Sequence, residues 1–169
     1  MRTARILIIC SVLIAAAGLV KPAAQLGPGE GASGHGERFS LGIIVGHPTG
    51  ISAKLWLGPN SAVDGALAWS FPGERFHLHA DYLHHFFDVF DVAPDRLPIY
   101  FGVGGNLRIR GDAPGDADAL RSGLRVPVGV SFLSSELPLD AFAEIVPGMR
   151  LIPSTEFELW GGIGARYRF

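Results

Sequence analysis

The sequence is short of charge and of sulfur. Charged residues make up 18% of the 169 residues, below the roughly 25% typical of soluble proteins, and Cys10 is the one cysteine. Because Cys10 lies in a segment that we expect to be removed, the mature chain would hold neither a disulfide nor a catalytic thiol. Helical periodicity is lacking as well, since from Phe39 onward no stretch keeps it for three turns.

The N-terminal segment has the pattern of a secretory signal peptide. Arg2 and Arg5 precede an apolar run from Ile6 to Val20, and small residues follow it. The run is too short for a spanning helix, so it predicts export, with cleavage after Ala17 or Ala24.

We expect the exported chain to be acidic. Of the 14 basic residues, Arg2, Arg5 and Lys21 fall within residues 1–24, which we take as the signal peptide; 11 remain against 16 acidic residues, a net charge of −5. An acidic chain without basic clusters binds nucleic acid poorly, which argues against that class of partner. Residues 25–38 are rich in glycine and predict a flexible lead-in.

Residues 39–169 alternate between short periodic segments and turn signals. The pattern predicts strands at 39–46, 50–57, 61–71, 75–86, 98–110, 120–133, 138–147 and 156–169. Glycine, proline, aspartate and serine fill the breaks between them. Eight is an even number of strands, and most approach the roughly 9–11 residues that cross a bilayer at a tilt.

The two faces of these strands differ in the size of their side chains. One face is bulky and apolar: Ile51, Ala53, Leu55, Leu57, Val63, Leu67, Trp69, Phe76, Leu78, Tyr82, Ile99, Phe101, Val103, Leu107, Ile109, Leu124, Val126, Val128, Val130 and Phe132. The other face is made mostly of glycine, alanine and serine, with isolated charges. A water-exposed face would carry lysine, glutamate or threonine at nearly every position, whereas small residues around a few charges suit a narrow, filled lumen. We therefore predict an all-β fold, an eight-stranded antiparallel up-and-down transmembrane β-barrel, in preference to a soluble barrel with its apolar face inward.

Aromatic residues on the bulky face agree with a membrane barrel. With the start of the barrel on the periplasmic side, Tyr82, Phe101, Phe132, Tyr167 and Phe169 fall near the periplasmic rim, and Trp69 and Phe71 near the outer rim. Aromatic girdles at both membrane interfaces are typical of such barrels. The same topology puts the long connection at 87–98 on the periplasmic side, where turns are usually short.

Several segments resemble those of a known family. "VGHPTGISAKLW", "HLHADYLHHF", "YFGVGG" and "LRVPVGVSF" look like the signature segments of a family of small, uncharacterised bacterial outer-membrane β-barrels. The closing "ARYRF" is similar to the terminal strand signal that hands such proteins to their insertion machinery, which would assign that role to Tyr167 and Phe169. The resemblance implies a fold and an outer-membrane location, and it implies no activity and no catalytic residue.

The inward face carries charges of both signs. The bases are Lys54, Arg108, Arg125 and Arg166, and the acids are Asp64, Asp81 and Glu144. Charges in a sealed lumen are costly unless they are paired and hydrogen-bonded. We expect an ion-pair network that plugs the barrel, with Lys54 paired to Asp64 and Arg125 paired to Glu144; a gated proton or ion path is the alternative.

Metal and catalytic sites have weaker support in the sequence. His77, His79 and Asp81 share one face at a spacing of two residues and are a weak candidate for zinc or copper. Neighbouring positions on one face of a strand are about 7 Å apart, so such a site would need ligands from an adjacent strand. The candidate pieces of a Ser-His-acid set, as a lipid A-modifying enzyme would need, are Ser70, His77, His79 and Glu144, but they form no local nucleophile motif.

Together these patterns predict a small outer-membrane protein of structural or surface-interaction type. We expect no catalytic activity, no cofactor and no resident metal. The expected partners are outer-membrane lipid, lipopolysaccharide and, during biogenesis, the barrel-insertion machinery, with the protein itself a monomer. A lipid A-modifying enzyme and a narrow gated channel are the alternatives.

Overall fold

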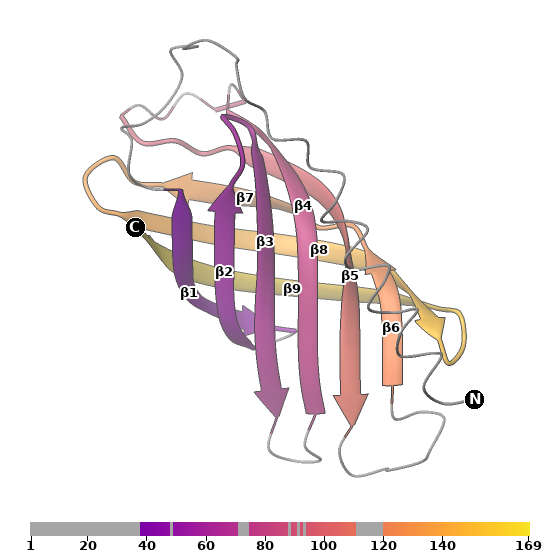
Figure 1. Cartoon of the computed structure of the whole chain (residues 1–169). Helices are drawn as coiled ribbons and strands as arrows, with labels where there is room; N and C mark the ends of the chain where they lie inside the picture. The colour runs from indigo at the N-terminus through magenta and orange to yellow at the C-terminus, as the bar shows by residue number, and fades with distance from the viewer. Residues whose placement is uncertain are drawn as a thin grey trace. The chain divides into compact units, whose positions relative to one another are not determined.

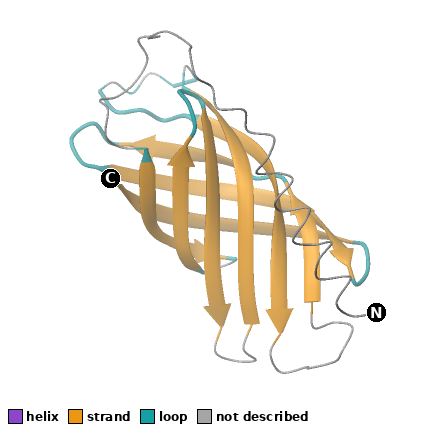
Figure 2. Cartoon of the chain, in the orientation of Figure 1, coloured by secondary structure: helices purple, strands orange, loops and turns teal. Residues whose placement is uncertain are grey.

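The computed structural model describes residues 38–47, 49–70, 75–87, 89–90, 92, 94–110 and 120–169. The expected signal peptide and nearly all of the lead-in lie outside these residues, as do Phe71 and the acidic segment at 111–119. All the regular structure in the described part is β (Figure 2).

The strands form one antiparallel sheet that closes on itself. They are β1 (Phe39–Gly46), β2 (Gly50–Trp56), β3 (Ser61–Ser70), β4 (Arg75–Phe86), β5 (Ile99–Arg110), β6 (Leu120–Arg125), β7 (Val128–Leu133), β8 (Leu139–Ile152) and β9 (Glu156–Arg168). Apart from β6 and β7, neighbours in sequence pair around the ring, and β1 pairs with β9 to close it, from Ser40 opposite Arg168 to Gly46 opposite Gly162. In Figure 1, β1 to β6 form the nearer wall, and β7, β8 and β9 cross behind them. The prediction of an up-and-down antiparallel barrel is confirmed.

The predicted strand at 120–133 is wrong in one respect, because the structure divides it into β6 and β7. Both pair with β5 and β8, and the register continues unchanged from Arg125 of β6 to Val128 of β7, so together they hold a single place in the ring and eight positions remain; the one shift against β8 lies within β6, between Ser122 and Gly123. Pro127 causes the division. Its carbonyl accepts a hydrogen bond from Gly102 of β5 at 2.8 Å, but its nitrogen has no proton to donate to the ladder.

The opposite error occurs in β8, which continues to Ile152 although the predicted strand ends at residue 147. Pro147 and Gly148 suggested a break. Pro147 is tolerated because it lies opposite the interruption between β6 and β7, where its carbonyl accepts from Val126 N at 2.9 Å. The ladder bonds that the two prolines cannot donate therefore fall in the same interval between β6 and β7, that of Pro127 toward Gly102 on β5 and that of Pro147 toward Val126.

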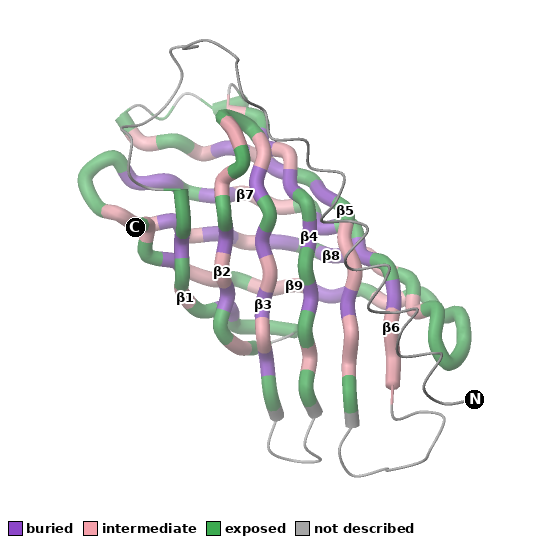
Figure 3. The backbone as a smooth tube through the Cα atoms, viewed as in Figure 1, coloured by how far each residue is buried: buried purple, intermediate pink, exposed green. Residues whose placement is uncertain are grey.

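Burial in this barrel is the reverse of that in a soluble protein. The bulky face predicted from the alternation points outward, with Val103 58% exposed and Leu124 54% exposed. On the inside, Lys54 and Arg125 are each 1% exposed. Along each strand the exposed and buried residues alternate (Figure 3).

The outward aromatic residues cluster at the end of the barrel where β1 begins, which we call the Phe39 end. Phe169 lies 6.1 Å from Phe39 and 4.9 Å from Tyr167, measured between ring centroids. Phe86 stacks on Phe101 with the ring centroids 5.7 Å apart. The opposite end, the Gly46 end, carries exposed Trp69 on the same outer face.

Candidate functional site in the barrel lumen

The centre of the lumen holds ions contributed by strands far apart in sequence. Lys54 Nζ on β2 lies 3.2 Å from Asp140 Oδ2 on β8. Arg166 on β9 donates to Asp64 Oδ2 on β3 at 2.8 Å and to Ser52 Oγ at 2.8 and 3.0 Å. A second nitrogen of Arg166 lies 3.8 Å from Asp140 Oδ2, which joins the two pairs.

Arg125 on β6 joins a second group of acids. Its Nε lies 2.9 Å from Asp81 Oδ2 on β4, and its Nη2 lies 3.4 Å from Glu144 Oε1 on β8. The other oxygen of Glu144 accepts a hydrogen bond from the Tyr100 hydroxyl at 2.9 Å. Arg125 therefore bridges two carboxylates across the lumen, and one of the bridges is to Glu144, as the sequence led us to expect.

The expected pairing of Lys54 with Asp64 is wrong. The two residues are directly opposite on β2 and β3, but Lys54 turns to Asp140 while Arg166 takes Asp64. Arg166 is the better partner because its planar group reaches Asp64 and Ser52 together. Asp140 was missed, although its position two and four residues before inward Phe142 and Glu144 identifies it as an inward residue.

These ions are almost fully removed from solvent. The side chains of Lys54, Asp64, Asp81, Arg125, Asp140, Glu144 and Arg166 are each at most 5% exposed. A buried charge that loses its partner destabilises a fold strongly, so the seven groups depend on one another. Four are acids and three are bases, which leaves the group one positive charge short when all are ionised.

A second layer of charge lies toward the Gly46 end. Arg108 forms an ion pair with Glu158 and lies over the Trp160 ring at 4.8 Å. Arg150 pairs with Glu156 and lies 3.7 Å from Glu158. Arg108 was expected in the central network, but its inward position near the end of β5 places it in this outer layer.

Aromatic rings fill the lumen toward the Phe39 end. The His85 ring lies 4.5 Å from Trp56, 5.2 Å from Tyr100 and 6.2 Å from Phe87, measured between centroids. Phe87 is the first residue after β4, so the connection to β5 contributes a ring to this cluster. Arg96 of the same connection lies over the Phe87 ring at 5.7 Å.

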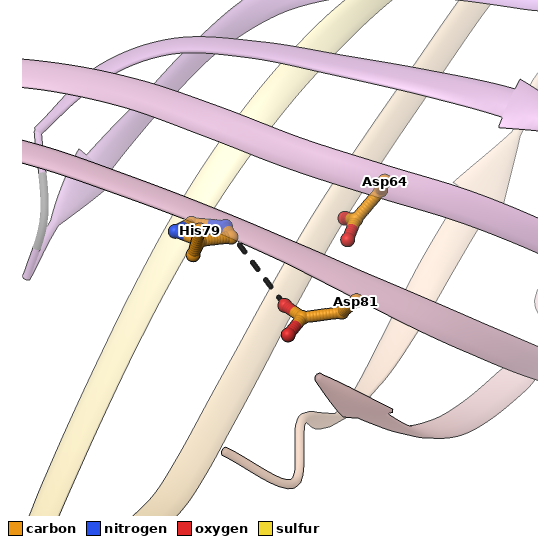
Figure 4. Close-up of side chains that lie close together, drawn as sticks. All are labelled: Asp64, His79 and Asp81. Atoms are coloured by element: carbon orange, nitrogen blue, oxygen red, sulfur yellow. Dashed lines mark ion pairs between the residues drawn. The ribbon is translucent and has the colours of Figure 1, made fainter. Parts of the chain in front are cut away.

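Three potential metal ligands converge beside the central network. Asp64, His79 and Asp81 each offer a ligand atom, and these atoms lie within 4.8 Å of one another (Figure 4). His77 was expected in this set and is not part of it; its ring centroid lies 5.9 Å from that of His79. Asp64 replaces it because β3 lies beside β4 and places Asp64 opposite Asp81.

The candidate hydrolase residues stay apart where the structure describes them. Glu144 is engaged by Tyr100 and Arg125. Ser70 ends β3, and its side chain lies outside the described atoms. None of the hydrogen bonds found in the described ranges joins His77 or His79 to a serine hydroxyl.

One solved structure provides a comparison for this barrel. The N-terminal β-barrel domain of Pseudomonas aeruginosa OprF superimposes with a TM-score of 0.52 and 13% sequence identity, covering 80% of this chain and 100% of that domain. The likeness is one of fold. Neither a protein-family model nor a curated protein sequence matches the chain. Within the described residues, no helix is long and apolar enough to span a bilayer.

Proposed function

We propose that the chain is a small outer-membrane β-barrel protein of structural or surface-interaction type, with a lumen closed by its ion-pair network and without catalytic activity. The observation that carries the proposal is the inverted burial. Ile145 and Ile163 are 62% and 64% exposed on the outer wall, whereas Asp140 is fully buried inside. Water would penalise that wall over its whole circumference, whereas hydrocarbon stabilises it.

Closure of the sheet supports the same environment. In hydrocarbon every backbone donor and acceptor must find a partner within the protein, and a closed ring leaves no free strand edge. The pairing of β1 with β9 supplies this closure. The fold likeness to the OprF domain, a β-barrel domain by its title, supports the closed barrel on which this argument depends.

The proposed orientation puts the Phe39 end in the periplasm. Lipid and lipopolysaccharide are the partners of the outer wall, and the insertion machinery is the partner during biogenesis, with Tyr167 and Phe169 as the signal that it reads. Both rings are exposed on the outer surface at this end. Residues 1–24 would direct export as a signal peptide and would then be cleaved off. The mature protein would act as a monomer. Membership of the small outer-membrane barrel family that the motifs resemble is part of this proposal.

Fractionation and gel mobility test the proposal together. We expect the protein to stay with outer membranes after a high-salt wash, and to migrate differently on a gel when unheated, because an intact barrel resists the detergent. A Phe169→Ala variant should reach the membrane in lower yield but refold normally from urea. Recovery of wild-type protein in the soluble periplasmic fraction would contradict the location, and equal yields of the two proteins would contradict the signal.

The two alternatives have their own tests. A lipid A-modifying enzyme would change the lipid A mass spectrum between cells that carry the gene and cells that lack it. A narrow gated channel would give conductance steps in a planar bilayer. The charged lumen is the observation that supports this alternative.

A further inference from the structure

The gap between Asp64, His79 and Asp81 has the composition of a metal site. Asp64 and Asp81 are directly opposite on β3 and β4, and His79 lies two residues before Asp81 on the same face. Ligands from two adjacent strands overcome the spacing of about 7 Å that keeps residues of one strand apart. One imidazole and two carboxylates form a set of nitrogen and oxygen ligands of the kind that binds zinc.

Each of the three side chains has an unused acceptor. Across the described residues, no hydrogen bond reaches Asp64 Oδ1, Asp81 Oδ1 or His79 Nδ1. The three side chains are 4%, 1% and 2% exposed. A buried polar atom left without a partner destabilises a fold, so the unused atoms of these three neighbouring side chains favour a bound cation as their partner.

Arginines orient both carboxylates of the proposed site. Arg166 binds Asp64 through Oδ2, and Arg125 contacts Asp81 through Oδ2. Asp64 therefore keeps its Oδ1 unused, and Asp81 Oδ2, which lies 3.9 Å from His79 Nε2, is the oxygen of Asp81 that faces the histidine. Metal-binding carboxylates are commonly oriented by outer hydrogen bonds of this kind.

The charge balance calls for a cation in the same place. The central network has four carboxylates, of Asp64, Asp81, Asp140 and Glu144, against the three bases that contact them. We propose that Asp64, His79 and Asp81 bind one divalent cation of the zinc class inside the lumen, where it more than offsets the one unpaired negative charge and joins β3 to β4. This inference goes beyond the proposed function, which requires no metal.

His77 lies next to the proposed site, on the side of the Gly46 end. It is half-buried, it lies on β4 two residues before His79, and its Nε2 has no hydrogen-bond partner within the described segments. The final site is closed to solvent, so we expect the metal to bind while the barrel assembles and to exchange slowly afterwards.

The metal content of refolded protein tests the proposal. Untagged chain would be refolded from urea into detergent with zinc chloride, freed of loose metal on a desalting column, and analysed by mass spectrometry for zinc. We expect about one zinc per wild-type chain, because binding is coupled to folding. In His79→Gln the affinity should fall by at least about 10-fold, the range seen for damaged metal sites. His84→Gln, on the outer side of the same strand, is the matched control and should bind as the wild type does.

Three results would overturn the metal site. They are a wild-type chain that holds no zinc after refolding, a His79→Gln chain that holds as much as the wild type, and an equal loss in His79→Gln and His84→Gln. The mobility of the unheated band reports whether each variant has folded. If His79→Gln does not fold, the urea midpoint of the wild type decides: zinc should raise it, and an unchanged midpoint rejects the site. None of these results bears on the outer-membrane location, which fractionation tests separately.

Discussion

Single buried ions are the residues on which this barrel depends most. Asp140 is the direct partner of Lys54, at 3.2 Å, and both side chains are fully buried. Asp140→Asn keeps the size and removes the charge, so Lys54 would remain as an uncompensated cation. We expect the free energy of unfolding to fall by about 3–5 kcal/mol. Urea unfolding of the refolded barrel, followed by tryptophan fluorescence, measures the change.

The matched control for this prediction is Glu136→Gln. Glu136 is exposed in the turn between β7 and β8, so the same chemical change there should alter stability by less than about 0.5 kcal/mol. Equal effects of the two substitutions would mean that Lys54 finds another partner when Asp140 is neutral. Arg166 beside Asp140 would then be the first residue to re-examine.

At the level of the strand, the two faces should respond oppositely to charge. Leu124 lies on the outer face of β6 opposite Gly105 in the middle of β5, and it is 54% exposed. If this face meets hydrocarbon, Leu124→Arg should lower the free energy of unfolding in lipid vesicles by about 2–4 kcal/mol. Leu137→Arg is the control, since Leu137 is equally apolar and 60% exposed but lies in a turn. A stable Leu124→Arg barrel would contradict the membrane-facing assignment of β6.

Strand boundaries could be predicted where turn residues and alternation agreed. β1 and β4 have the predicted limits, because nothing within them interrupts the period of two; glycine and proline follow β1 and precede β4. Pro127 and Pro147 misled the prediction in opposite directions. Each removes one ladder donor, and the effect on the strand depends on what lies opposite, which the local sequence does not contain.

At the level of the whole molecule, the lumen should not conduct steadily. Arg125 and Arg166 span its centre with their acidic partners, and the rings around His85 fill it toward the Phe39 end. We expect a planar bilayer containing the purified barrel to show no regular conductance steps under conditions where a porin gives them. Reproducible steps that remain after repurification would support the gated channel instead.

The sequence by itself determined which residues face outward and which face inward. A period of two separates the faces of any strand, and the contrast between bulky apolar and small polar side chains then distinguishes lipid from lumen. It also identified six of the seven central ions, since each occupies an inward position. That much follows from local alternation, without knowledge of which strands meet.

Only the tertiary structure decided which ions meet across the lumen. Lys54 and Asp140 are 86 residues apart, and Asp64 and Arg166 are 102 apart. Whether two inward residues lie at the same height depends on the tilt and stagger of the strands when the ring closes, which are properties of the whole sheet. The convergence of Asp64 with His79 and Asp81 has the same origin, because it required the register between β3 and β4.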